Sequence, residues 1–223
     1  MALELVRNPT LSRSRCSRSV SSRVSTRAPA RIRNIMNNSR FEISDTPLAG
    51  LKVIQRKPVE DERGFLCRIF CADEFHHAGF HKPIAQINHT HTYKTGAVRG
   101  LHFQYPPFAE AKIVNCIKGK IYDVAVDIRY GSTTFLHWHA ELLSSDNLKS
   151  YFIPEGFAHG YQTLADDCEL LYLHSEKFSP DAIGALNVFD PRLVIPWPLE
   201  ITEISDRDRQ HPFINNNFKG VIL

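Results

Sequence analysis

The chain has 223 residues, a net charge of +3 and 43% hydrophobic residues. No apolar run approaches the roughly 20 residues of a membrane-spanning helix, so we expect a soluble globular protein with no membrane partner. Five cysteines, none in a CxxC pair, indicate reduced intracellular thiols rather than a disulfide framework.

The charge is unevenly distributed along the chain. Residues 1–40 hold nine arginines and one glutamate, a charge of +8, so the remainder carries −5. Arg- and Ser-rich, acid-poor composition is typical of a plastid or mitochondrial transit peptide. A disordered extension, with Met36 as the effective start, and a basic nucleic-acid-binding tail are the alternatives. We expect one folded domain over residues 41–223, cytoplasmic or organellar and not secreted, whose mildly acidic surface argues against nucleic acid as a partner.

Short strands dominate the rest of the chain. A strand over 51–56 leads to a tight turn at 61–64 and a short helix over 73–78, with Asp73 as its N-cap. Further strands are predicted over 84–88, 100–104, 112–117, 120–128, 134–143, 150–153, 161–165 and 169–174. An irregular, proline-rich tail begins at residue 190 and contains one turn at 205–209. Many short strands separated by turns predict an all-β sandwich or barrel with a few short helices.

The segment Arg99-Gly100-Leu101-His102-Phe103-Gln104 places a cation three residues from an imidazole on a predicted strand. Residues i and i+3 of a regular strand point to opposite faces. Gly100 permits a bulge that would bring both side chains to one face. We therefore expect Arg99 and His102 to meet in one pocket.

Other histidines leave a metal site open as an alternative. His89 and His91 share a strand face, and His159 lies in the segment 154–160, which we expect to be a turn that exposes it between two glycines. Together they could serve a metal-dependent cupin oxygenase. No carboxylate follows His91 within four residues, which weakens that interpretation. A single histidine on an apolar strand is more often structural than functional.

Seven segments follow one another in an order that resembles the dTDP-4-dehydrorhamnose 3,5-epimerase family of deoxysugar biosynthesis. They are Gln86-x-Asn88, Arg99 to Gln104, Ala111-Lys112, Asp123 to Arg129, Pro154 to Gly160, Asp190-Pro191 and Trp197-Pro198-Leu199. The resemblance runs from about residue 43 to 212. It implies a cupin-type jelly roll that works as a homodimer without metal or organic cofactor. It also implies epimerisation of an NDP-4-keto-6-deoxyhexose at C3 and C5.

The resemblance assigns roles to individual residues. His102 is expected to be the proton acceptor, Asp208 its orienting carboxylate, Tyr172 the proton donor and Lys112 the cation beside the keto oxygen. Together with Lys112, the residues expected to hold the nucleotide-sugar are Arg63, Gln86, Asn88, Arg99, His159 and Arg207. The chemistry fits, because protons next to a ketone are acidic and inversion needs a base and an acid on opposite faces.

Three departures from the family pattern concern the substrate. Arg68 and Ile183 stand where the family has glutamates associated with substrate holding, and Phe178 stands where many relatives have tyrosine. These differences leave the nucleotide base, the exact sugar and the number of inverted carbons open. The alternatives are an epimerase acting at one carbon, an isomerase acting on another nucleotide-sugar, and a non-catalytic sugar-binding protein.

Overall fold

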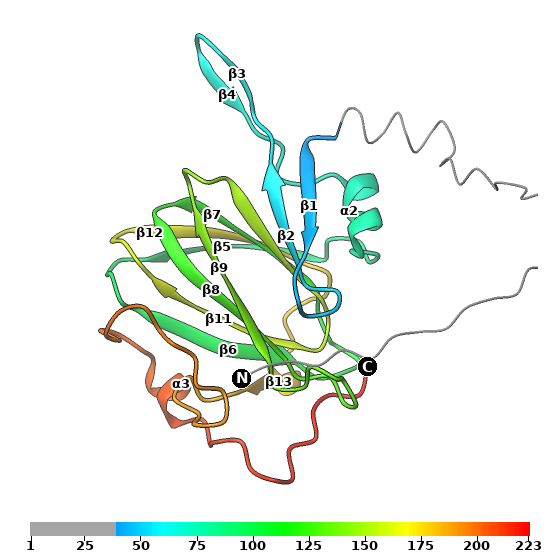
Figure 1. The fold of residues 1–223 in the computed structure, drawn as a ribbon, viewed down its shortest axis with the longest axis vertical. Coiled ribbons are helices and arrows are strands. Elements are labelled where there is room, and N and C mark those ends of the chain that lie inside the picture. Colours follow the sequence, from blue (N-terminus) through cyan, green and yellow to red (C-terminus); the bar gives the residue numbers. More distant parts are fainter. Residues whose placement is uncertain (1–38) are drawn as a thin grey trace, which may run out of the picture. The chain divides into compact units, whose positions relative to one another are not determined.

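The computed structural model describes residues 39–223, which form two facing antiparallel sheets (Figure 1). The predictions for residues 1–38 lie outside this range. The six-stranded sheet has the order β1 (Phe41–Asp45), β2 (Lys52–Arg56), β10 (Lys149–Ile153), β7 (Lys112–Lys118), β12 (Cys168–His174) and β5 (Gln86–Thr92). The five-stranded sheet has the order β13 (Ile183–Ala185), β6 (Val98–Gln104), β11 (Phe157–Thr163), β8 (Lys120–Asp127) and β9 (Trp138–Ser144). The expected all-β architecture is confirmed.

Few elements lie outside the two sheets. The strands β3 (Val59–Asp61) and β4 (Gly64–Leu66) form a hairpin that projects away from the sheets (Figure 1). The helical segments are α2 (Ala72–Ala78), the 3₁₀ turn η1 (Pro180–Ala182) and α3 (Asp206–Gln210). None of the helices described between residues 39 and 223 is long and apolar enough to cross a membrane.

Both faces of the five-stranded sheet are buried. Ile121 and Leu143 of its inner face join Tyr151 of the six-stranded sheet in one buried cluster. The C-terminal segment covers its outer face, where Leu193 and Ile195 join the side chains of the strands. Burial on both faces explains why β8 has a fully apolar middle. The irregular tail is therefore part of the core.

The predicted bulge is present in β6. His102 pairs with His159 of β11, whereas Arg99 pairs with Tyr161, so three residue steps on β6 oppose two on β11. Gly100 has φ +121, and a Cβ there would lie 2.5 Å from the Cα of Gly160. A side chain is therefore excluded where the two strands cross. The extra residue brings Arg99 and His102 to the same face.

Three local predictions were wrong. Cys71, not Asp73, is the N-cap of α2, and Asp73 lies in the first turn, where a carboxylate still complements the helix dipole. The segment 154–160 begins with the predicted turn, but from Phe157 it is strand β11, so His159 is buried rather than exposed, because Gly160 serves the close approach to β6. The strand predicted to start at residue 134 starts at Trp138, since the Thr134 hydroxyl instead donates a hydrogen bond to Asp127.

Candidate active site

A cavity of about 880 Å³ opens between the two sheets, and its lining contains eight of the ten predicted site residues. These eight are Asn88, Arg99, His102, Lys112, His159, Tyr172, Arg207 and Asp208. His102, Arg99 and His159 come from the five-stranded sheet, whereas Lys112 and Tyr172 come from the six-stranded sheet. The cavity is therefore flanked by an imidazole from one sheet and by an ammonium and a phenol from the other.

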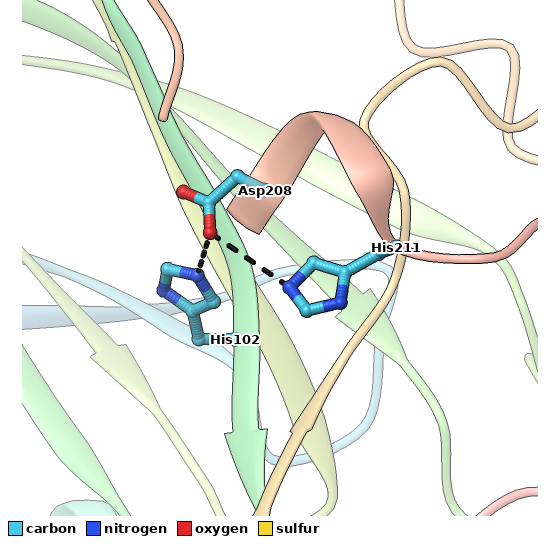
Figure 2. Close-up of side chains that lie close together, drawn as sticks. All are labelled: His102, Asp208 and His211. Carbon is cyan, nitrogen blue, oxygen red and sulfur yellow. Dashed lines mark hydrogen bonds and ion pairs between the residues drawn. The ribbon is translucent and has the colours of Figure 1, made fainter. Parts of the chain in front are cut away.

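Asp208 holds the imidazole of His102 in place. The Nε2 atom of His102 lies 2.8 Å from Oδ1 of Asp208, as the dashed line in Figure 2 shows. Ser205 caps α3 by accepting a hydrogen bond from the Asp208 backbone N–H, which fixes the start of the helix. If Nε2–H donates to the carboxylate, Nδ1 of neutral His102 is left as the basic nitrogen.

Asp208 is ionised over the physiological pH range. Its burial alone would raise the pKa of the carboxyl group, but the hydrogen bond and charge of His102, the Gly100 N–H and the Arg207 guanidinium outweigh it and lower the pKa to about 2. The side chain of His102 is 33% exposed, whereas that of Asp208 is 4% exposed. This arrangement suits a base that faces the cavity and becomes positively charged when it takes a proton.

His211 is a second imidazole directed at the same carboxylate (Figure 2). Its Nε2 lies 3.8 Å from Oδ1 of Asp208 and has no hydrogen-bond partner within residues 39–223. The ligand atoms of His102, Asp208 and His211 lie within 4.8 Å of one another and could hold a small cation. The guanidinium of Arg207 lies 3.4 Å from Nε2 of His102, so a metal ion would first have to displace this positive group.

The structure separates the three histidines of the alternative metal site. His89 and His91 lie on the outer face of β5, where they contact Glu169 and Asp167 respectively. His159 is buried between the sheets, with Nε2 2.6 Å from Oδ1 of Asp123. Their ligand atoms form no common group in the described part of the chain.

Glu110 connects Lys112 with a histidine that the sequence analysis did not select. Its Oε1 accepts from Nζ of Lys112 at 2.9 Å, and its Oε2 lies 2.7 Å from Nδ1 of His174. Burial alone would raise the pKa of Glu110, but the Lys112 charge and the His174 contact lower it to about 2. Lys112 thus faces the cavity as an ammonium whose position is set by an ionised carboxylate.

Tyr172 contributes a neutral phenol. Burial holds its pKa well above the usual value of 10, so the hydroxyl keeps its proton at neutral pH. Its ring packs edge-on against His159 and stacks on His174. A phenol held in this way can deliver a proton to a carbanion.

The two guanidinium groups of the cavity have different partners. Nε of Arg99 donates to the Thr92 hydroxyl at 3.1 Å, and that hydroxyl also contacts Tyr161. Arg207 is largely exposed and contacts Asp208 through Nε at 3.5 Å. Two guanidinium groups at one cavity suit a ligand that carries phosphates.

Two predicted substrate-holding residues do not line this cavity. Arg63 lies at the tip of the β3–β4 hairpin, where its exposed guanidinium pairs with Asp61. Gln86 lies on the same face of β5 as Asn88, next to the cavity lining, and donates a hydrogen bond to Oδ1 of Asn88 at 3.0 Å. Gln86 can act by orienting Asn88, whereas Arg63 is too remote in its own chain.

The residues that depart from the family pattern lie at two different places. Arg68 forms an ion pair with Glu74 of α2 at 2.9 Å, outside the cavity. Ile183 and Phe178 both line the cavity, and Phe178 is 58% exposed. The apolar replacements therefore affect the cavity surface, while the charged one supports a helix.

Besides His211, sequence reasoning missed three groups at the site. His174 is two residues from Tyr172 on one strand, and this spacing places both on the same face. Glu110 is likewise two residues from Lys112. The i, i+2 signal was present in both cases. Asp123 could not be paired with His159 from the sequence, because the two are brought together only by the register of β8 and β11.

Comparison with known proteins identifies the family. The family model described as dTDP-4-dehydrorhamnose 3,5-epimerase matches residues 45–216. The chain belongs to this family. A dTDP-4-dehydrorhamnose 3,5-epimerase of Methanothermobacter thermautotrophicus is 36% identical over 180 residues, covering 79% of this chain and 96% of the relative. The resemblance inferred from the sequence is confirmed, and members of this family are isomerase-class enzymes that act on nucleotide-sugars.

Two solved structures extend the comparison. A dTDP-6-deoxy-D-glucose-3,5-epimerase of Legionella pneumophila, in complex with dTDP-4-keto-L-rhamnose, is 32% identical with a TM-score of 0.76, covering 82% of this chain and 99% of that chain. A 3'-monoepimerase of Streptomyces bikiniensis, in complex with dTDP-quinovose, is 31% identical with a TM-score of 0.71, covering 75% and 85%. The same fold therefore serves epimerases that differ in the number of carbons inverted.

Proposed function

We propose that the protein converts dTDP-4-dehydro-6-deoxy-D-glucose to dTDP-4-dehydro-L-rhamnose by inverting C3 and C5. The observation that carries this proposal is the placement of His102 and Tyr172 at one cavity, on strands of opposite sheets. Inversion needs a base and an acid on the two faces of the sugar carbon. The relatives named above act on substrates of this kind.

In the proposed reaction, His102 removes the proton next to the C4 carbonyl, and the electron pair moves to the carbonyl oxygen. Lys112 stabilises the resulting enolate, a preorganised electrostatic effect worth about 3 kcal/mol in comparable sites. Tyr172 then donates its phenolic proton to the opposite face of the carbon. Asp208 keeps the imidazole oriented and compensates the charge of the imidazolium.

The nucleotide end of the substrate is assigned to the cationic and polar groups of the cavity. Arg99, Arg207 and His159 line it, and guanidinium groups bind pyrophosphate through paired hydrogen bonds. Arg63 lies outside the cavity of its own chain. In the expected homodimer, Arg63 could reach a substrate only in the cavity of the second copy.

The test is turnover of dTDP-4-dehydro-6-deoxy-D-glucose in deuterium oxide, coupled to a 4-reductase, with deuterium located by NMR. We expect one deuterium at C3 and one at C5 for the wild type and none for His102→Ala. Exchange at both carbons in the variant would refute His102 as the base. Equilibrium sedimentation of the wild type tests the dimer, and a mass of one chain would refute it.

Inversion at a single carbon is the second candidate. Phe178 stands at the cavity where many relatives have tyrosine, and a fold relative of this chain is a monoepimerase. The same NMR experiment distinguishes the two, because a monoepimerase leaves only one carbon deuterated. If Phe178 limits the second inversion, Phe178→Tyr should increase deuterium at the less exchanged carbon.

For residues 1–40 we propose organelle targeting, supported by nine arginines, abundant serine and a single acid. A fluorescent protein fused behind residues 1–40 should enter a plastid or mitochondrion. A fusion in which all nine arginines are replaced by glutamine is the control. A diffuse cytosolic signal from the unmodified fusion would refute targeting.

A further inference from the structure

Hydrogen bonds connect the mouth of the cavity with its interior along the edge of the six-stranded sheet. The backbone N–H of Phe178 donates to Oε1 of Gln86 at 3.0 Å. Nε2 of Gln86 donates to Oδ1 of Asn88 at 3.0 Å, and Nδ2 of Asn88 lies 3.4 Å from Nε2 of His174. The series thus reaches a buried histidine that has no role in the proposed proton transfers.

The series continues from His174 to the ammonium of the cavity. Nδ1 of His174 lies 2.7 Å from Oε2 of Glu110, and Oε1 of Glu110 accepts from Nζ of Lys112. The side chains of Glu110 and His174 are each 11% exposed, and that of Lys112 is 7% exposed. Their positions are therefore set by one another rather than by water.

Only one direction of donation satisfies every contact. A backbone N–H can only donate, so the Phe178 amide requires the oxygen of Gln86 to face it. The amide nitrogen of Gln86 then donates to Asn88, whose own amide nitrogen must donate to Nε2 of His174. Neutral His174 consequently carries its proton on Nδ1 and donates it to Glu110, which is ionised because its pKa is lowered to about 2.

We propose that His174 and Glu110 are positioning residues for substrate binding, an inference that rests on the proposed function for the identity of the ligand. They hold Asn88, through its amide, in an orientation that keeps one N–H free at the cavity, and they hold the Lys112 ammonium. The free N–H groups of the series suit an acceptor-rich ligand, such as the hydroxyl and phosphate oxygens of a nucleotide-sugar.

Protonation of His174 would break the series. An N–H at Nε2 of His174 would point at the amide N–H of Asn88. Rotating the Asn88 amide to present its oxygen to His174 would instead point its N–H at the amide N–H of Gln86. The other groups around the imidazole are the carboxylate of Glu110, the ammonium of Lys112 and the stacked ring of Tyr172, 5.8 Å away. The hydrogen-bond series therefore requires a neutral imidazole at His174.

Two substitutions of His174 test the hydrogen bonds of Nδ1 and Nε2 separately. In His174→Asn, the amide nitrogen replaces Nδ1 and can still donate to Glu110 but does not reach Asn88. In His174→Gln, the longer side chain reaches Asn88 and can accept from it. His91→Asn is the matched control, because His91 also contacts a carboxylate, Asp167, but on the outer face of β5.

The binding probe is dTDP-glucose, a nucleotide-sugar without the reactive ketone, measured by calorimetry at pH 7.5. At pH 7.5 we expect His174→Asn to raise Kd about fivefold, the effect of one lost hydrogen bond, and His174→Gln to restore at least half of the affinity. His91→Asn should match the wild type.

Turnover gives a second measurement, with KM following Kd and kcat staying within about twofold in His174→Asn. Wild-type affinity in His174→Asn, or equal losses in the Asn and Gln variants, would overturn the positioning role. A wild type that binds dTDP-glucose but does not turn over the 4-keto sugar would refute the proposed function and leave the binding comparison intact.

Discussion

Two histidines that each pair with an aspartate lie side by side in the five-stranded sheet, and the two pairs have opposite properties. His102 pairs with Asp208 and His159 with Asp123, in both cases through Nε2 and Oδ1. The two histidines face each other across β6 and β11. The chemical groups are the same, so the difference between the pairs comes from their surroundings.

Burial accounts for that difference. Asp123 has a fully buried side chain, and desolvation raises its pKa, while burial lowers the pKa of His159. Asp208 accepts additional hydrogen bonds and lies near positively charged groups, which lower its pKa to about 2. Its partner His102 is partly exposed at the cavity. The His102–Asp208 pair can therefore take up and release a proton, whereas the His159–Asp123 pair disfavours charge and takes no part in the proposed proton transfers.

The largest effect should come from replacing His102, and the same substitution of His159 provides the comparison. We expect His102→Asn to lower kcat by about 10³-fold, because a general base contributes this much. His159→Asn should lower kcat by less than tenfold and should mainly raise KM, since His159 is assigned to substrate holding. Steady-state rates from the coupled reductase assay measure both. Similar losses of kcat in the two variants would remove the proposed distinction between the pairs.

Substitutions of Asp208 and Asp123 should differ in their effect on kcat in the same way as those of the two histidines. Asp208→Asn should lower kcat by about 10²-fold while the protein stays folded, because the amide no longer fixes the imidazole or compensates its charge. Near-normal kcat in this variant, with His102→Asn inactive, would show that His102 acts without Asp208. Circular dichroism of the purified variant provides the folding control.

Asp123→Asn should affect stability more than rate. Its carboxylate is buried and contacts His159 at 2.6 Å, so weakening the contact should cost about 2 kcal/mol of unfolding free energy. Urea unfolding measures this cost, and kcat should fall by less than fivefold. A loss of kcat comparable with that of Asp208→Asn would contradict a role for Asp123 outside the proton transfers.

The smallest effect concerns acid stability. The pKa of Asp208 is lowered from 3.8 to about 2 in the folded state, so its contribution is complete above about pH 4 and declines as the pH falls toward 2. By pH 3 this decline amounts to about 1 kcal/mol. Asp208→Asn lacks the group and should lose that much less stability between pH 5 and pH 3 in urea titrations. An equal loss in both proteins would contradict the lowered pKa.

Much of the fold and site could be predicted from local patterns. Regularly spaced short strands predicted the two-sheet architecture, and Gly100 predicted the bulge that joins Arg99 and His102 at one face. The ends of elements were less predictable. Ala158-His159-Gly160 has the composition of a turn but forms a buried strand, because its glycine serves contact with Gly100 rather than chain reversal.

The sequence by itself determined the family, the strand-rich fold and the residues proposed as the base, the acid and the ammonium. Only the tertiary structure decided which histidine receives which carboxylate, and that Glu110 and His174 belong to the cavity. Local composition sets the intrinsic chemistry of a side chain. Its partners and desolvation come from strands distant in sequence, and these decide whether it carries charge.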